Sequence, residues 1–200
     1  MLKAIILSAG QGTRLKPLTD NCPKPMVKIG SKPVLEHTIN MLKKHGVTDI
    51  AINLHHYPQV VMDYFGDGKS FGVRMHYSLE KEILGTAGAV KKLKGYFDDT
   101  FVVVYGDVFS FTDITAMMRF HKDKKGIATI GLYKVDNPHE CGIVEMSQNN
   151  RVVRFLEKPK REEIFTNMAN SGIYILETEI MNYIPQDVYY DFGKDLFPLL

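Results

Sequence analysis

The residues best suited to chemistry gather in one long loop near the amino terminus. Residues 8–30 read SAGQGTRLKPLTDNCPKPMVKIG and carry one acid, Asp20, against four cations, Arg14, Lys16, Lys24 and Lys28. Gly10 and Gly12 allow the backbone to approach a ligand closely, with its amide groups turned toward it. Glycines and an excess of cations that follow a first strand are typical of a polyphosphate site. The competing interpretation is a flexible surface loop with solvated lysines.

The common phosphate-binding motifs do not fit this loop. A P-loop requires the spacing GxxxxGK[ST], which residues 8–30 lack. The dinucleotide-binding fingerprint requires a third glycine at position 15, which is Leu15, and a helix that opens at once. The loop therefore predicts a phosphate site of another kind.

Short apolar runs alternate with helical patterns and would position this loop. The predicted strands are residues 2–7, 50–54, 73–77 and 101–105, and the predicted helices are Val34–Lys44, Pro58–Phe65 and residues 86–93. Continuous apolar strands such as FVVVY need helices on both faces of the sheet. The alternation predicts an α/β fold with a doubly wound, mostly parallel, Rossmann-like mixed sheet. Further strands are predicted at residues 126–135, Gly142–Met146, 152–156 and 171–176, with short helices on either side of the last.

Length and composition limit the class of protein. The 200 residues carry a net charge of +2, with 44% hydrophobic and 24% charged residues, the balance of an average globular domain. Near-neutrality argues against a nucleic-acid partner and against a polybasic membrane anchor, and no apolar run approaches the ~18 residues of a membrane span. Cys22 and Cys141 lack metal-type spacing and indicate reduced thiols, with a disulfide between the two as the alternative. We expect a single domain over residues 1–200 and a cytoplasmic location.

Five segments resemble the sugar-1-phosphate nucleotidyltransferases, or NDP-sugar pyrophosphorylases. They are LSAGQGTRLKPLT with PKPM at residues 7–26, LGTAGAV at 84–90, GDV at 106–108, FLEKP at 155–159 and NSGIYIL at 170–176. The resemblance implies a GT-A-like fold and transfer of a nucleotidyl group from a nucleoside triphosphate to a sugar 1-phosphate, with release of pyrophosphate. The attacking phosphate is mostly ionised at neutral pH, so the reaction needs charge neutralisation and in-line alignment rather than a general base.

The resemblance assigns three residues to catalysis. Arg14 would bind the leaving pyrophosphate through its planar fork, and Lys24 would stabilise the α-phosphate and the pentavalent transition state. Asp107, which follows an apolar strand through Gly106, would hold a Mg²⁺ ion that bridges the phosphates of both substrates. From the residues alone, exposed cations and an ordinary aspartate at a turn stay open as alternatives.

The resemblance also implies two substrate subsites. The nucleotide side would be formed by Ser8, Ala9, Gly10, Gly12, Thr13, Glu80, Gly85 and Thr86, and the sugar-phosphate side by Gly142, Glu157, Lys158 and Asn170. Glu80 stands where the family reads the base. A carboxylate accepts hydrogen bonds from guanine N1–H and N2–H₂, so we expect GTP rather than a pyrimidine nucleotide. The alternatives are a solvated loop at Glu80 and a surface ion pair of Glu157 with Lys158 or Arg154.

The carboxyl-terminal part departs from the family pattern. The family has a second metal-binding aspartate in a W-x-D-x-G-like segment, which Asp187, Asp191 and Asp195 do not match, and this chain has no tryptophan. We therefore expect that the domain lacks its carboxyl-terminal end. The strings CGIVEM, RFLEKP and YDFGKDLFP favour a mannose-1-phosphate guanylyltransferase. Alternatives are UTP or dTTP with glucose 1-phosphate, GTP with heptose 1-phosphate, and a non-catalytic regulatory subunit that binds nucleotide-sugar; homo-oligomer formation is left open.

Overall fold

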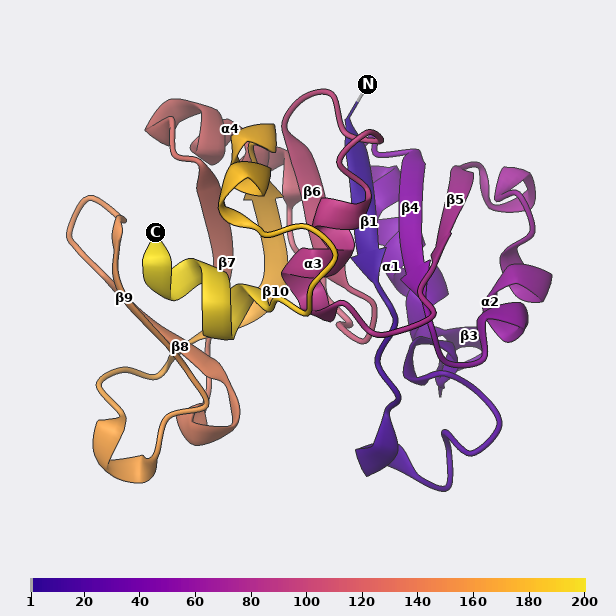
Figure 1. Ribbon diagram of the computed structural model, residues 1–200, viewed down its shortest axis with the longest axis horizontal. Helices are drawn as coiled ribbons and strands as arrows, with labels where there is room; N and C mark the ends of the chain where they lie inside the picture. The colour runs from indigo at the N-terminus through magenta and orange to yellow at the C-terminus, as the bar shows by residue number, and fades with distance from the viewer. Residues whose placement is uncertain (1) are drawn as a thin grey trace.

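An eight-stranded sheet organises the chain in the order β5-β4-β1-β6-β10-β8-β9, with β7 also paired to β10 (Figure 1). The computed structural model describes residues 2–200, except for the side chain of Arg14. The strands are β1 (Lys3–Leu7), β2 (Lys28–Ile29), β3 (Lys32–Pro33), β4 (Asp49–Leu54), β5 (Arg74–Leu79), β6 (Phe101–Tyr105), β7 (Ala128–Lys134), β8 (Gly142–Met146), β9 (Val152–Glu157) and β10 (Met168–Leu176). The α-helices are α1 (Val34–Lys44), α2 (Pro58–Phe65), α3 (Gly85–Lys92) and α4 (Ile114–Lys124).

The parallel half of the sheet is centred on β1. Ile5 of β1 stands between Ala51 of β4 and Val103 of β6, and β5 extends the parallel arrangement beyond β4. The antiparallel strand β10 then joins β6 and carries β7 and β8. The expected α/β class with a doubly wound mixed sheet is confirmed.

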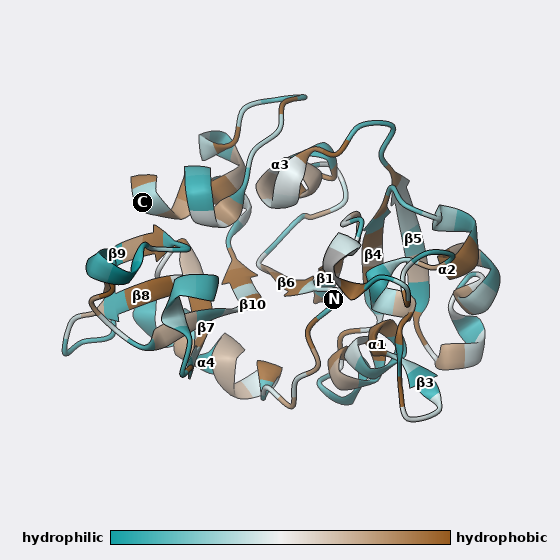
Figure 2. Ribbon diagram, turned by 90° about the horizontal axis from the view of Figure 1, so that it is seen from below, coloured by the Kyte–Doolittle hydropathy of each residue, from teal (hydrophilic) through white to brown (hydrophobic). Residues whose placement is uncertain are grey.

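Alternating side chains of the central strands fill two cores, one on each face. Ala4 and Ile6 of β1 pack with α1 and α2, whereas Ile5 packs with α3 and with Phe192 near the carboxyl terminus. Figure 2 shows the apolar strands between α3 on one side and α1 and α4 on the other. Strands covered on both faces are mostly apolar, and all six residues of β4 are buried. Its two polar residues, Asp49 and Asn53, are hydrogen-bonded.

Two parts of the chain hold more regular structure than the sequence predicts. The helix α4 was missed; Asp113 caps it by accepting a hydrogen bond from Ala116 N at 2.8 Å, and Lys125 ends it in the left-handed conformation where glycine is usual. The long first loop contains two 3₁₀ turns, Thr13–Leu15 and Lys24–Met26, followed by the β2–β3 hairpin. The loop therefore contains regular structure of its own.

Candidate active site

The carboxyl ends of the parallel strands β1, β4 and β6 reach the same edge of the sheet, where a cavity of about 250 Å³ opens. Ligands bind at this edge in open α/β sheets. The cavity is lined by Leu7, Ser8, Ala9, Gly10, Lys24, Pro25, Asn53, Ile83, Gly85, Thr86, Tyr105, Asp107, Tyr189 and Asp191. The fold thus brings together seven predicted site residues, namely Ser8, Ala9, Gly10, Lys24, Gly85, Thr86 and Asp107.

Lys24 and Asp107 meet in this cavity as an ion pair. Lys24 opens a 3₁₀ turn after Pro23, and Asp107 follows Gly106 just beyond β6. The Lys24 Nζ donates to Asp107 Oδ2, and the two side chains are 32% and 33% exposed. A cation and a carboxylate that face one cavity can bind a phosphate and a divalent cation respectively.

Close packing holds the first loop against Lys24. Gly12 has a φ of 64°, and a Cβ at this position would lie 2.9 Å from Lys24 Cβ. The Thr19 hydroxyl donates to Gly12 O at 2.9 Å and closes the loop. Gly12 therefore shapes the loop, whereas Gly10 is exposed and has open space where a side chain would stand, which leaves its backbone accessible to a ligand.

The other predicted residues of this loop differ in position. Ser8 is buried, and its amide donates to Asn53 Oδ1 at 2.7 Å. A Cβ at Gly106 would lie 2.2 Å from Ser8 Oγ, so β6 can approach β1 this closely only with glycine at position 106. Thr13 is exposed and outside the cavity lining. The side chain of Arg14 lies outside the described part of the structure, so its predicted role at pyrophosphate stays a prediction.

Glu80 is buried beside the cavity rather than in its lining. Its Oε1 accepts a hydrogen bond from Asn53 Nδ2 at 2.8 Å, and its Oε2 accepts one from Leu84 N at 3.1 Å. Since only 6% of Glu80 is exposed, the alternative of a solvated loop is wrong at this residue. Contact with a nucleotide base stays a prediction.

The glycines of LGTAGAV make room for a segment more than 100 residues away in sequence. Tyr190 O accepts hydrogen bonds from Ala87 N at 2.9 Å and Gly88 N at 3.0 Å, at the start of α3. A Cβ at Gly85, where φ is 75°, would lie 2.5 Å from Tyr190 O, and one at Gly88 would lie 2.8 Å from Val188 O. These contacts bring Tyr189 and Asp191 into the cavity lining.

On the predicted sugar side, Glu157 lies against two glycines. A Cβ at Gly142 would lie 2.5 Å from Glu157 Oε2, and one at Gly193 would lie 2.6 Å from the same atom. Burial, and then the negative charge of Asp191, raise the pKa of Glu157 above its usual value. Glu157 forms no ion pair with a described residue, so the predicted alternative of a surface ion pair is wrong.

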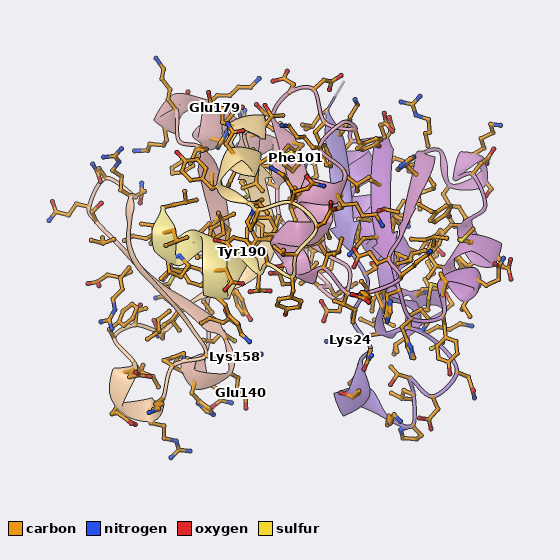
Figure 3. All side chains as sticks on the ribbon, in the orientation of Figure 1. Lys24, Phe101, Glu140, Lys158, Glu179 and Tyr190 are labelled. Carbon is orange, nitrogen blue, oxygen red and sulfur yellow. The ribbon has the colours of Figure 1, made fainter. Side chains whose placement is uncertain are left out.

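The remaining sugar-side residues lie on neighbouring strands or at their ends. Ala169 of β10 pairs with Ile143 of β8, which places Asn170 beside the strand that begins at Gly142. Lys158 is exposed, with a φ of 47°. Figure 3 shows Lys158 and Lys24 at the same lower end of the molecule, on its two halves. The predicted sugar side lies near the cavity, since the negative charge of Asp191, which lines the cavity, contributes to the raised pKa of Glu157.

Sequence reasoning missed Asn53, Tyr105 and Tyr189, and considered Asp191 only to find that it does not match the family's second metal-binding motif. Asn53 carries a usable signal, because an amide near the end of the apolar strand IAINL must find partners when it is buried. Tyr189 and Asp191 carry none, since only the folded chain brings them to α3.

A larger groove of about 1030 Å³ lies elsewhere, between β7, β9 and the last residues of the chain. None of the predicted site residues lines it. In the described part of the chain, no three or more His, Cys, Asp and Glu side chains are grouped to hold a metal ion. Residues 2–200 also contain no helix long and apolar enough to cross a membrane.

The sequence profile of the Nucleotidyl transferase family matches residues 3–200. The chain belongs to this family. The chain is 42% identical to "UTP--glucose-1-phosphate uridylyltransferase" of Synechocystis sp., over 100% of this chain and 55% of that protein. It is 40% identical to "Probable mannose-1-phosphate guanylyltransferase 1" of Oryza sativa, over 98% and 55% of the two chains.

Solved structures agree with this assignment. HddC from Yersinia pseudotuberculosis, solved as a complex with GMP-PN, matches this chain with a TM-score of 0.84 and 29% identity, over 100% of this chain and 87% of HddC. A glucose-1-phosphate thymidylyltransferase described as putative in its title, from Bacillus anthracis, matches with a TM-score of 0.84 and 30% identity, over 92% and 74% of the two chains. The chain spans about half the length (55%) of the curated relatives it matches.

Proposed function

We propose that this nucleotidyl transferase catalyses in-line attack of a sugar 1-phosphate on the α-phosphate of a nucleoside triphosphate, which yields a nucleotide-sugar and pyrophosphate. The observation that carries the proposal is the meeting of Lys24 and Asp107 in one cavity at the carboxyl ends of β1 and β6. Two anionic substrates repel each other, so the site must supply positive charge and alignment. Lys24 supplies the charge at the α-phosphate, and Arg14 at the pyrophosphate.

Asp107 fits a Mg²⁺ ion. Mg²⁺ usually keeps several waters and binds one or two carboxylates together with substrate phosphates, so Asp107 alone is a sufficient protein contribution, and Asp191 also lines the cavity. When bound, the ion supplies neutralisation of phosphate charge. Asp107 would hold the ion, and Lys24, which is paired with this carboxylate in the structure, would then be available for the incoming phosphate.

The sugar 1-phosphate would bind on the β8–β10 side. Glu157 presents its carboxylate to the sugar hydroxyls, Gly142 keeps the backbone close, and Asn170 donates from its side-chain amide. Lys158 adds a cation for the second anionic substrate. We favour mannose 1-phosphate, and the relatives named mannose-1-phosphate guanylyltransferase support this choice.

Glu80 supports guanine as the base, and its contacts define a sharp test. Glutamine at position 80 must place its amide nitrogen opposite either Asn53 Nδ2 or Leu84 N, both of which are donors. Glu80→Gln therefore loses a structural hydrogen bond whichever way it points. If Glu80 reads guanine, the variant loses kcat/KM with GTP more than with UTP. Equal losses with both nucleotides would show that Glu80 only supports the loop.

The experiment that tests the reaction is pyrophosphate release in the presence of Mg²⁺, from GTP, UTP, dTTP, CTP and ATP each combined with mannose, glucose and heptose 1-phosphates. We expect the fastest release from GTP with mannose 1-phosphate. Fastest release from UTP with glucose 1-phosphate would instead support the second candidate, which the 42% identity to a uridylyltransferase favours. Binding of nucleotide-sugar without release in any combination would contradict catalysis and support a regulatory role.

A further inference from the structure

Tyr57 lies at the start of α2, outside the lining of the cavity, and has a strained backbone. Its φ of 47° and ψ of 51° place it in the left-handed region, where a Cβ crowds the following carbonyl oxygen. Glycine, asparagine and aspartate enter this region readily, whereas a bulky aromatic residue is an outlier. Strained residues cluster where the fold positions a functional group, so Tyr57 is a candidate for such a role.

The hydroxyl of Tyr57 reaches the long first loop. It donates a hydrogen bond to Asp20 O at 2.7 Å, across 37 positions of the chain. The ring of Tyr57 lies against the ring of His56, with centroids 4.2 Å apart. Among the described residues, the other hydrogen bonds of residues 10–22 stay within this segment. Tyr57 therefore ties the outer part of the loop to α2.

The segment that Tyr57 holds is packed against Lys24. Thr19 precedes Asp20, is only 2% exposed, and donates from its hydroxyl to Gly12 O at 2.9 Å. A Cβ at Gly12 would lie 3.1 Å from Thr19 Cγ2 and 2.9 Å from Lys24 Cβ. Gly12 is thus enclosed between Thr19 and Lys24, and close-packed groups transmit a displacement from one to the next.

We propose that Tyr57 is a positioning residue that holds the first loop in the conformation in which Lys24 lines the cavity. It contacts no reacting atom and acts through Asp20, Thr19 and Gly12. An anchor far from the chemistry can control the rate, because a misplacement of about 1 Å in a catalytic group can cost two orders of magnitude. The inference rests on the proposed function, which assigns Lys24 to the α-phosphate.

Tyr57→Phe tests the proposal, because it removes the hydroxyl and keeps the ring that lies against His56. The kcat for pyrophosphate release from GTP and mannose 1-phosphate should fall about 3- to 10-fold, the effect of losing one hydrogen bond. The KM for mannose 1-phosphate should not change, because the predicted sugar side is built on β8–β10. In the Lys24→Met background, Tyr57→Phe should lower kcat no further, because the hydroxyl acts through Lys24.

The matched control is Tyr77→Phe, which removes a tyrosine hydroxyl that donates to Gly66 O at 2.8 Å, at the other end of α2. This control should leave kcat unchanged. Equal falls of kcat in both variants, or no fall in Tyr57→Phe, would overturn the proposal. A full additional fall in the Lys24→Met background would also overturn it, because the hydroxyl would then act through another group.

A second measurement is independent of turnover. The backbone amides of Leu15 and Asp20 donate within the loop, to Gly12 O at 2.9 Å and Pro17 O at 3.1 Å. Their hydrogen exchange, followed by NMR in the protein without ligand, should become about 3- to 10-fold faster in Tyr57→Phe and stay constant in Tyr77→Phe. Unchanged exchange in Tyr57→Phe would overturn the positioning role even if the wild-type protein released no pyrophosphate. That absence of release would by itself contradict only the proposed reaction.

Discussion

Lys24→Met removes the central cation of the site while keeping a long, unbranched side chain. Two unit charges 4 Å apart interact by about 4 kcal/mol at the effective dielectric near a protein surface, which corresponds to nearly a thousandfold in rate. Solvent weakens the interaction at Lys24, since 32% of the side chain is exposed. We therefore expect kcat to fall by about 100- to 1000-fold, the range for loss of one charge-stabilising donor.

The assay is pyrophosphate release at saturating GTP and mannose 1-phosphate with Mg²⁺, together with the affinity for a fluorescent GTP analogue. Binding should weaken far less than kcat, because the transition state carries the charge that Lys24 stabilises. Lys28→Met is the control, since Lys28 is an exposed cation on β2 outside the cavity lining. A kcat of Lys24→Met close to that of the wild type, or equal losses in both variants, would refute the reasoning.

Two further predictions concern stability. Gly85→Ala should lower the melting temperature by roughly 5–15 °C, because the backbone at this position is left-handed and the added methyl group would overlap with Tyr190 O. Gly95→Ala is the control and should change the melting temperature little, because a Cβ at Gly95 would stand in open space. Equal melting temperatures of the two variants would contradict the packing described for α3. Burial and the negative charge of Asp191 raise the pKa of Glu157 in the folded protein above its ordinary value of 4.5. The free energy of unfolding should therefore fall as the pH rises from 4.5 through the raised pKa, because the unfolded chain loses this proton more readily. Thermal melts across this range should show Glu157→Gln gaining on the wild type as the pH rises, and a constant difference would contradict the raised pKa.

The helices and strands of the first half were predictable because their periodicity is strong and their ends are marked. Val34–Lys44 has the predicted bounds, and Pro58–Phe65 begins at a proline and ends at Gly66 as expected. The helix α4 was missed because its polar surface weakens the pattern and because a lysine, Lys125, takes the left-handed position at its end where glycine is usual. Local rules of capping and periodicity thus account for both outcomes.

Part of the cavity lining was predictable, since one ordered motif carries Ser8, Gly10 and Lys24, and all three line the cavity. The role of Gly85 was only partly predictable. A glycine is needed at position 85 because the backbone of Tyr190 packs against it. The two residues are 105 positions apart, so no local sequence pattern predicts this contact.

The most direct test of the central claim uses GTP labelled with ³²P at its α-phosphate, mannose 1-phosphate and Mg²⁺, with wild-type protein and Asp107→Asn side by side. The account predicts that the wild type transfers the label into a nucleotide-sugar with one pyrophosphate per turnover. Asp107→Asn should bind GTP yet transfer no label, because the carboxylate at the end of β6 is lost. Undiminished transfer by Asp107→Asn, or label released by the wild type as GMP or GDP without nucleotide-sugar, would contradict it.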